Sequence, residues 1–78
     1  MYVIGHTGNI YTGSFVKIGT KLILHGFGEM LKDNGMSYNG YFVYGRREGQ
    51  FTVKNVFTGR FMYCMYFDDV FIRILGNI

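Results

Sequence analysis

The pattern G-x-x-Y-x-G-x-F occurs twice in this 78-residue chain, and it constrains the fold more than any other feature. The first copy starts at Gly8 and the second at Gly35, 27 residues further on. A fixed pattern repeated in so short a chain indicates one supersecondary unit that is copied along the sequence. The stretch from Phe61 to Met65, which starts 23 residues after Tyr38, reads as a degenerate third copy that has lost its glycine.

The composition around these copies favours strands and turns over helices. The chain contains twelve Gly, eight Phe and seven Tyr but no alanine and no proline,. Alternate residues from Tyr38 to Tyr44 share one face of a strand, and Asn39, Tyr41 and Val43 share the other,. Gly40 then leaves a gap between two aromatic side chains, and we expect a ring from a neighbouring strand to fill that gap.

Glycine, asparagine and aspartate divide the chain at intervals typical of an antiparallel meander. Residues 33–35, Asp-Asn-Gly, predict a turn, and residues 45–49 predict a polar hairpin loop,. We expect an all-β fold with strands near residues 9–16, 22–31, 37–44, 50–56, 60–67 and 70–75. Residues 68–76 have two interpretations, a strand favoured by their β-branched residues or a short helix capped by Asp68 and ended by Gly76.

Further glycines follow each copy at matching places: Gly26 and Gly28 after the first, and Gly45 and Gly49 after the second. This ordered set resembles the MORN repeat (membrane occupation and recognition nexus), whose unit forms one β-hairpin. The resemblance covers residues 8–67, although Phe51 stands where the family prefers glycine. It implies a single domain over residues 1–78, built as a meander of about three MORN-like hairpins.

A domain as small as this one has few interactions besides its hydrophobic core that could stabilise it. A chain of this length buries a modest share of its surface, and such chains often rely on disulfides, metals or association. Cys64 is the only cysteine, and the sequence has no C-x-x-C or H-x-x-x-H spacing, so we expect neither a disulfide within the chain nor a metal or other cofactor,. We therefore expect self-association or docking on a partner to supply additional stability.

The residues capable of catalysis do not form a recognisable set. Asp68 and Asp69 are adjacent, so in a strand their side chains would point to opposite faces,. Cys64 could pair with His6 or His25 as a thiol and its base, but nothing in the sequence brings them together. A buried cysteine in an aromatic strand behaves as a small apolar side chain. We therefore expect a protein that is not an enzyme and has no catalytic residue.

The formal net charge of +3 is compatible with three kinds of partner: protein, nucleic acid and an anionic membrane surface,. The second hairpin interleaves rings with cations, as in proteins that stack single-stranded bases. The MORN resemblance implies contact with anionic phospholipid, and four cations fall in predicted loops: Lys17, Lys21, Arg46 and Arg47. A single-layer sheet leaves a face and two edges uncovered, which favours a protein partner.

Aromatic and arginine side chains dominate binding hot spots, and on this basis the sequence predicts a partner site. Its candidate residues are Tyr38, Tyr41, Tyr44, Arg46 and Arg47. The bias towards Phe, Tyr, Ile, Asn, Lys and Met is typical of AT-rich genomes and suggests a small phage or viral effector that inhibits a host protein. Residues 1–6 lack the features of a targeting segment, and no apolar run reaches the length of a membrane span, so we expect a cytoplasmic protein, in a host cell if viral,.

Overall fold

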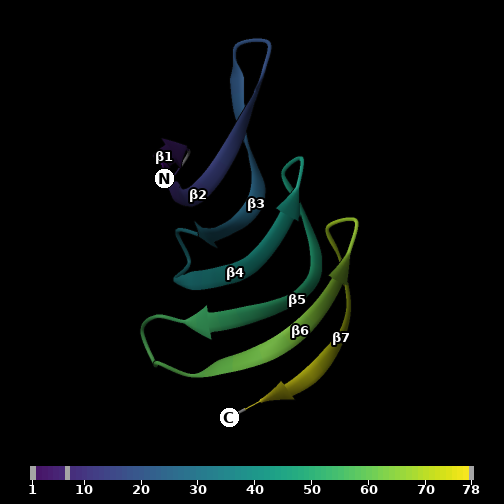
Figure 1. The fold of residues 1–78 in the computed structure, drawn as a ribbon. Coiled ribbons are helices and arrows are strands. Elements are labelled where there is room, and N and C mark those ends of the chain that lie inside the picture. Colours follow the sequence, from purple (N-terminus) through teal and green to yellow (C-terminus); the bar gives the residue numbers. More distant parts are fainter. Residues whose placement is uncertain (1, 7, 78) are drawn as a thin grey trace.

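A computed structural model describes residues 2–6 and 8–77, with the backbone alone for 2–4, 6 and 77. This part of the chain forms one antiparallel sheet of seven strands in the order β1 to β7, so that each strand pairs with its neighbours in sequence (Figure 1). The predicted all-β meander is confirmed. The strands are β1 (Tyr2–His6), β2 (Asn9–Ile18), β3 (Lys21–Leu31), β4 (Met36–Val43), β5 (Arg46–Asn55), β6 (Phe61–Phe67) and β7 (Val70–Asn77).

The two ends of the chain differ from the sequence prediction. Strand β1 was not among the expected strands, and residues 70–77 form a strand and not the alternative short helix. Asp68 and Asp69 have φ angles of 51° and 68° and connect Phe67 to its cross-strand partner Val70. Two successive residues with positive φ form the two-residue turn that suits the twist of a hairpin, and this geometry excludes a helix start at Asp68.

The hairpin loop predicted at residues 45–49 is wrong. The turn consists of Tyr44 and Gly45, with φ angles of 47° and 82°, and Val43 pairs directly with Arg46. The polar residues that follow belong to β5, where a bulge places Phe51 opposite Gly40 and Arg47 opposite Phe42,. The sequence also predicts four cations in loops, but the structure places all of them in strands: Lys17, Lys21, Arg46 and Arg47. The Asp33–Gly35 turn is confirmed, with the Gly35 amide donating to the Lys32 carbonyl at 3.0 Å.

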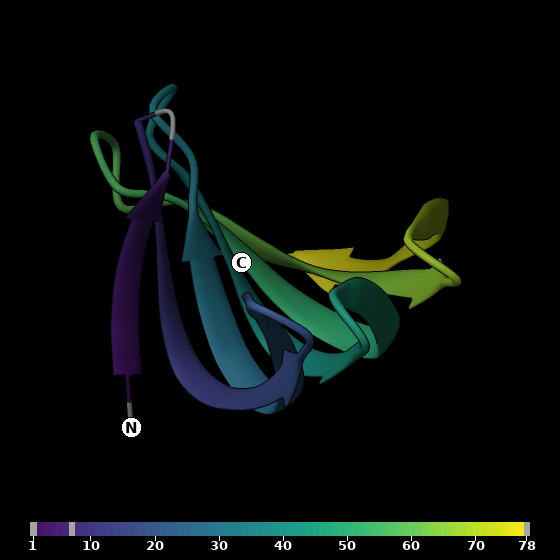
Figure 2. The same cartoon turned by 90° about the horizontal axis from the view of Figure 1, so that it is seen from above.

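One face of this single-layer sheet carries the hydrophobic core. The strands bend strongly along their length (Figure 2), and the bending lets side chains of the same face bury one another. A bulge in β3, which places Leu24 opposite Phe15 and Gly28 opposite Gly13, matches the bulge in β5. In both copies of the Y-x-G-x-F pattern, the following strand thus carries its bulge opposite the segment between the glycine and the phenylalanine. The buried apolar residues are Leu24, Phe42, Phe51, Val53, Cys64 and Tyr66.

Gly40 makes room for a core side chain, as the sequence predicts. A Cβ atom added to Gly40 would lie 2.8 Å from Cγ and Cδ2 of the Phe51 ring, so this ring occupies the gap on the neighbouring strand. The same cross-strand row continues from Phe51 to Cys64. Met62 occupies the row of Tyr38, so Cys64 stands on β6 at the place that Gly40 has on β4.

Candidate functional site

The structure separates the five residues predicted to bind a partner. Tyr38 and Arg47 lie on the core face, Tyr41 lies on the opposite face, and Tyr44 and Arg46 lie at the turn that joins β4 to β5. These positions do not form one continuous surface. The predicted alternation is correct for residues 38–43, but Tyr44 leaves it because its positive φ places it in the turn.

The Arg47 side chain is held within the fold. Its guanidinium carbon lies 5.0 Å from the centre of the Tyr38 ring and 4.3 Å from the centre of the Tyr66 ring. Its Nε donates a hydrogen bond of 2.6 Å to the Asp69 carboxylate, and its side chain is only 18% exposed. Burial raises the pKa of the Tyr66 hydroxyl, while the Arg47 charge acts in the opposite direction. Arg47 thus ties β5 to the turn between β6 and β7.

Tyr44 and Arg46 are exposed at one end of the sheet. The Tyr44 amide donates to His25 Nδ1 at 3.1 Å, and the two rings lie 4.4 Å apart. Arg46 forms an exposed ion pair with Asp68, with 3.1 Å between Nη1 and Oδ1. Arg46 and Asp68 thus join two neighbouring hairpin turns. This end of the sheet presents the exposed Tyr44 ring and a pair of opposite charges.

The thiol lies in the core. Cys64 is buried, and burial raises its pKa, which disfavours the reactive thiolate,. His25 contacts Tyr44 at the turn, and the His6 side chain lies outside the described residues.

Within the described part of the chain, no three His, Cys, Asp or Glu side chains are grouped so that they could hold a metal ion. The described residues include no helix that is long and apolar enough to span a membrane.

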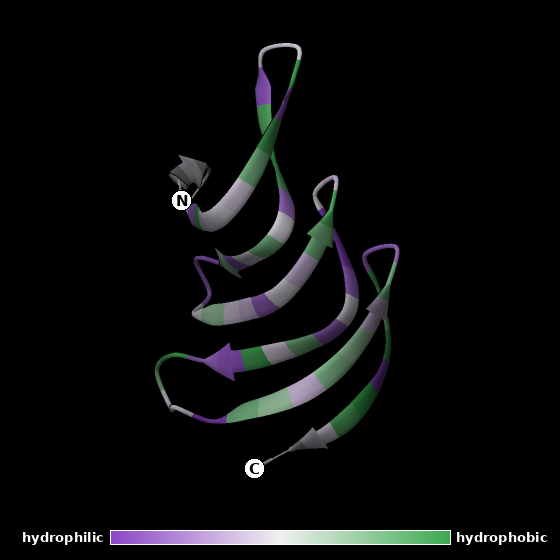
Figure 3. Ribbon diagram, viewed as in Figure 1, coloured by the Kyte–Doolittle hydropathy of each residue, from purple (hydrophilic) through white to green (hydrophobic). Residues whose placement is uncertain are grey.

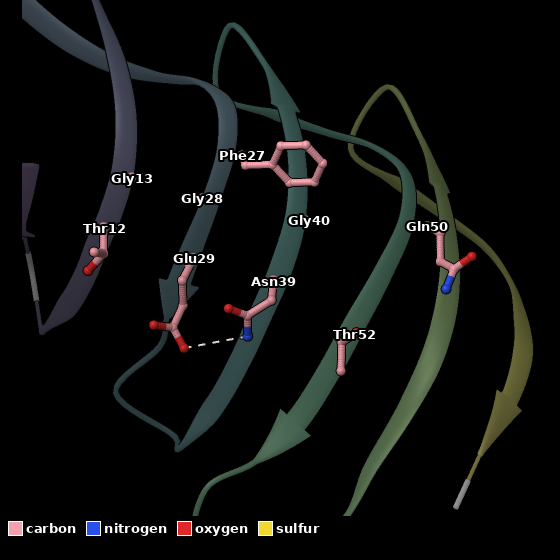
Figure 4. Close-up of a pocket in the computed structure, with 9 residues that line it drawn as sticks. All are labelled: Thr12, Gly13, Phe27, Gly28, Glu29, Asn39, Gly40, Gln50 and Thr52. Atoms are coloured by element: carbon pink, nitrogen blue, oxygen red, sulfur yellow. Dashed lines mark hydrogen bonds between the residues drawn. The ribbon is translucent and has the colours of Figure 1, made fainter. Parts of the chain in front are cut away.

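A hollow of about 590 Å³ lies on the face opposite the core (Figure 4). Its polar side chains come from neighbouring positions on β2 to β5, and Phe27 stands beside them. Phe27 is 74% exposed and packs edge-to-face against Tyr41, with the ring centres 5.3 Å apart. The hollow is lined by Thr12, Gly13, Phe27, Gly28, Glu29, Asn39, Gly40, Gln50 and Thr52.

The last strand carries the largest group of neighbouring exposed apolar residues in the described chain. Strand β7 pairs with β6 on one side and ends the sheet on the other. Its apolar side chains, together with Phe67 at the end of β6, are between 39% and 66% exposed. Figure 3 colours most of β7 as hydrophobic, with one hydrophilic segment inside the strand, where the sequence has Arg73. We call this set the β7 patch: Phe67, Val70, Phe71, Ile72, Ile74 and Leu75.

Sequence reasoning missed both Phe27 and the β7 patch. Five of the six residues 70–75 are apolar, with only Arg73 between them, and such a run is typical of a strand covered on both faces, so the sequence contained a signal for the patch,. Phe27 lies between two glycines that were assigned only to the repeat. Comparison with protein-family models gives no match, and comparison with curated proteins gives none either. The MORN resemblance therefore stays a prediction.

Proposed function

We propose that this chain is a non-enzymatic protein-interaction module that binds its partner along β7. The observation that carries the proposal is the β7 patch on the last strand of an open sheet. An edge strand offers a row of backbone donors and acceptors to which another chain can add a strand. Apolar side chains flank this row on β7, so a docking chain would gain both backbone pairing and apolar burial.

The sequence of β7 lacks the usual protection of an exposed edge. Natural sheets protect such edges with prolines, lysines or covering loops. Strand β7 contains neither proline nor lysine, and Arg73 is the only charged residue in it. Monomeric soluble proteins rarely leave apolar patches larger than a few hundred Å² uncovered. A partner that covers this edge would remove the exposed surface.

The geometry offers less support for nucleic-acid binding. Of the rings that the sequence places along the second hairpin, Phe42 and Phe51 are buried in the core. Tyr41 and Tyr44 are exposed on different surfaces, and Arg47 is held by Asp69. Stacking of successive bases needs rings on one surface, so we favour a protein partner. Binding to anionic lipid and an origin in a phage or virus stay predictions from the sequence.

The proposal is tested by placing lysines on β7. The immobilised wild-type chain and its variants are exposed to extract of the native cells, and captured proteins are quantified by mass spectrometry. We expect Val70→Lys with Ile72→Lys to lose the proteins that the wild-type chain captures, because two charges would be desolvated on docking. Light scattering on the same samples reports whether the partner is a second copy of the chain.

Matched variants separate the β7 edge from other surfaces. Ile18→Lys with Val56→Lys makes the same chemical change at exposed positions outside the patch and should keep the captured proteins. Tyr44→Ala with Arg46→Ala tests the turn predicted from the sequence. If this variant loses the partner while the β7 variant keeps it, the turn is the binding site and the β7 proposal is wrong. Circular dichroism establishes that each variant is folded.

A further inference from the structure

We propose that the hollow opposite the core is a second binding site, which takes a neutral carbohydrate chain lying across strands β2 to β5. This site lies over the central strands, on the face opposite the core, and does not include residues of the β7 edge. It consists of a row of polar side chains beside the exposed Phe27 ring (Figure 4).

The polar row follows from the strand register. Thr12 pairs with Glu29, Glu29 with Asn39, and Asn39 with Thr52. Cross-strand partners point to the same side of a sheet, and neighbouring strands lie about 4.8 Å apart. The row therefore presents one polar group at each such step across four strands. A chain of sugar rings carries hydroxyl groups at a similar repeat along its length, so it can follow this row.

Hydrogen bonds inside the hollow orient two of these groups and leave others available. The Ser37 hydroxyl is buried and donates to Glu29 Oε2 at 2.5 Å, and Asn39 Nδ2 donates to Ser37 Oγ at 2.9 Å. A carboxylate and an amide held in this way are positioned before a ligand arrives. The side chains of Thr12, Gln50 and Thr52 form no hydrogen bond with another described residue. They can therefore donate to and accept from ligand hydroxyls.

Phe27 supplies the apolar part of the site. Its ring is 74% exposed, and the edge-to-face contact with Tyr41 supports it from the neighbouring strand. A sugar ring has one face of C–H groups and a rim of hydroxyls, which matches an aromatic face beside polar groups. The volume of about 590 Å³ lies within the range of small-molecule sites, roughly 300–1,000 Å³,.

The same lining disfavours other ligands. Glu29 is the only charged residue among the described lining residues, so a phosphate or nucleic acid would meet a negative charge and no cation. Strands β2 to β5 each pair on both sides, so a peptide cannot add its backbone here,. A purely apolar ligand would bury Thr12, Gln50 and Thr52, whose side chains have no hydrogen-bond partner among the described residues,. A neutral polyhydroxylated ligand satisfies all of these groups.

The test uses two defined probes, cellohexaose and chitohexaose, titrated into the ¹⁵N-labelled chain and followed by NMR. We expect at least one of them to give saturable shifts at residues of the hollow, unchanged when the salt concentration is raised tenfold. Phe27→Ala, and separately Thr12→Val with Thr52→Val, should each weaken binding by about tenfold or more, and their spectra report that the fold is retained.

Phe57→Ala is the matched control, because Phe57 is 78% exposed and lies outside the hollow. This variant should bind as the wild-type chain does. The proposal is overturned if neither saccharide produces shifts, or if Phe57→Ala weakens binding as much as Phe27→Ala. Shifts caused by hexalysine that disappear in high salt would identify a cationic peptide as the ligand in place of a carbohydrate.

Discussion

The contact between Gly40 and Phe51 predicts a large effect from one added methyl group. A Cβ atom at position 40 would lie 2.8 Å from two atoms of the Phe51 ring and 2.9 Å from the Gln50 carbonyl oxygen. Phe51 is fully buried, so its ring cannot move into solvent. Overpacking of this kind costs typically 1–3 kcal/mol. The smaller entropy of the unfolded alanine chain offsets about 0.4–1 kcal/mol. We therefore expect Gly40→Ala to lower the free energy of unfolding by about 1–2 kcal/mol.

Thermal unfolding and urea unfolding measure this change. For a domain of 60–100 residues, 1 kcal/mol shifts the melting temperature by about 4–8 °C, so the effect is well resolved. Gly76→Ala is the control, because apart from its chain neighbours no atom of the described residues lies within 4 Å of a Cβ atom at that position. This control should be as stable as the wild-type chain or slightly more stable. Equal stability of the Gly40 and Gly76 variants would refute the close packing of Phe51 on Gly40.

A double-mutant cycle checks that the ring is the cause. Phe51→Leu removes the flat ring and is itself destabilising, because it leaves unfilled space in the core. Adding Gly40→Ala to Phe51→Leu should cost less than it does in the wild-type chain, since the new methyl group can occupy that space. Additive effects would show that the contact with the Gln50 carbonyl oxygen, and not the Phe51 ring, makes alanine unfavourable at position 40.

Two further predictions concern charged and titrating groups around the core. Arg47→Met should lower the free energy of unfolding by about 2–4 kcal/mol, because it removes two contacts with aromatic rings and an ion-paired hydrogen bond, whereas Arg46→Met should cost less than about 1 kcal/mol,. Equal losses would contradict the assignment of Arg47 to the core. Burial raises the pKa of the Cys64 thiol and of the Tyr66 hydroxyl, so the unfolded chain loses these protons at lower pH than the folded chain. The contribution of these two protonated groups to the free energy of unfolding should therefore be fully present below their unfolded pKa values. The free energy of unfolding should fall as the pH rises from about 8 to about 11. The variant Tyr66→Phe should show a smaller fall over this range. A urea midpoint that rises over the same range would contradict the prediction.

Local sequence pattern determined most of the fold. The absence of alanine, the wealth of aromatic residues and the glycine spacing specify strands and turns, and six of the seven strands follow from them. The packing of a ring on Gly40 was also predictable, because glycine is the one residue without a side chain to occupy that space. The turn at residues 33–35 follows from Asp-Asn-Gly, whose residues tolerate turn conformations,.

The residues that make up the candidate sites depend on strand register, on bulges and on the exact position of turns, which a local sequence pattern does not specify. Strand side chains alternate with a period of two, so one bulge or one shifted turn moves every later residue to the other face. The turn at Tyr44 and Gly45 and the bulge in β5 therefore decided that the Arg47 guanidinium contacts the rings of Tyr38 and Tyr66. The register decided that Cys64 lies in the same cross-strand row as Gly40 and Phe51.

The sequence by itself determined that the chain forms a β-meander with glycine-bounded aromatic strands, because these preferences belong to single residues and their near neighbours. Only the tertiary structure decided which of those rings and cations meet. It buries Tyr66 and Phe51 and leaves Phe27 and the β7 patch exposed, because exposure depends on how the bent sheet folds over one of its faces.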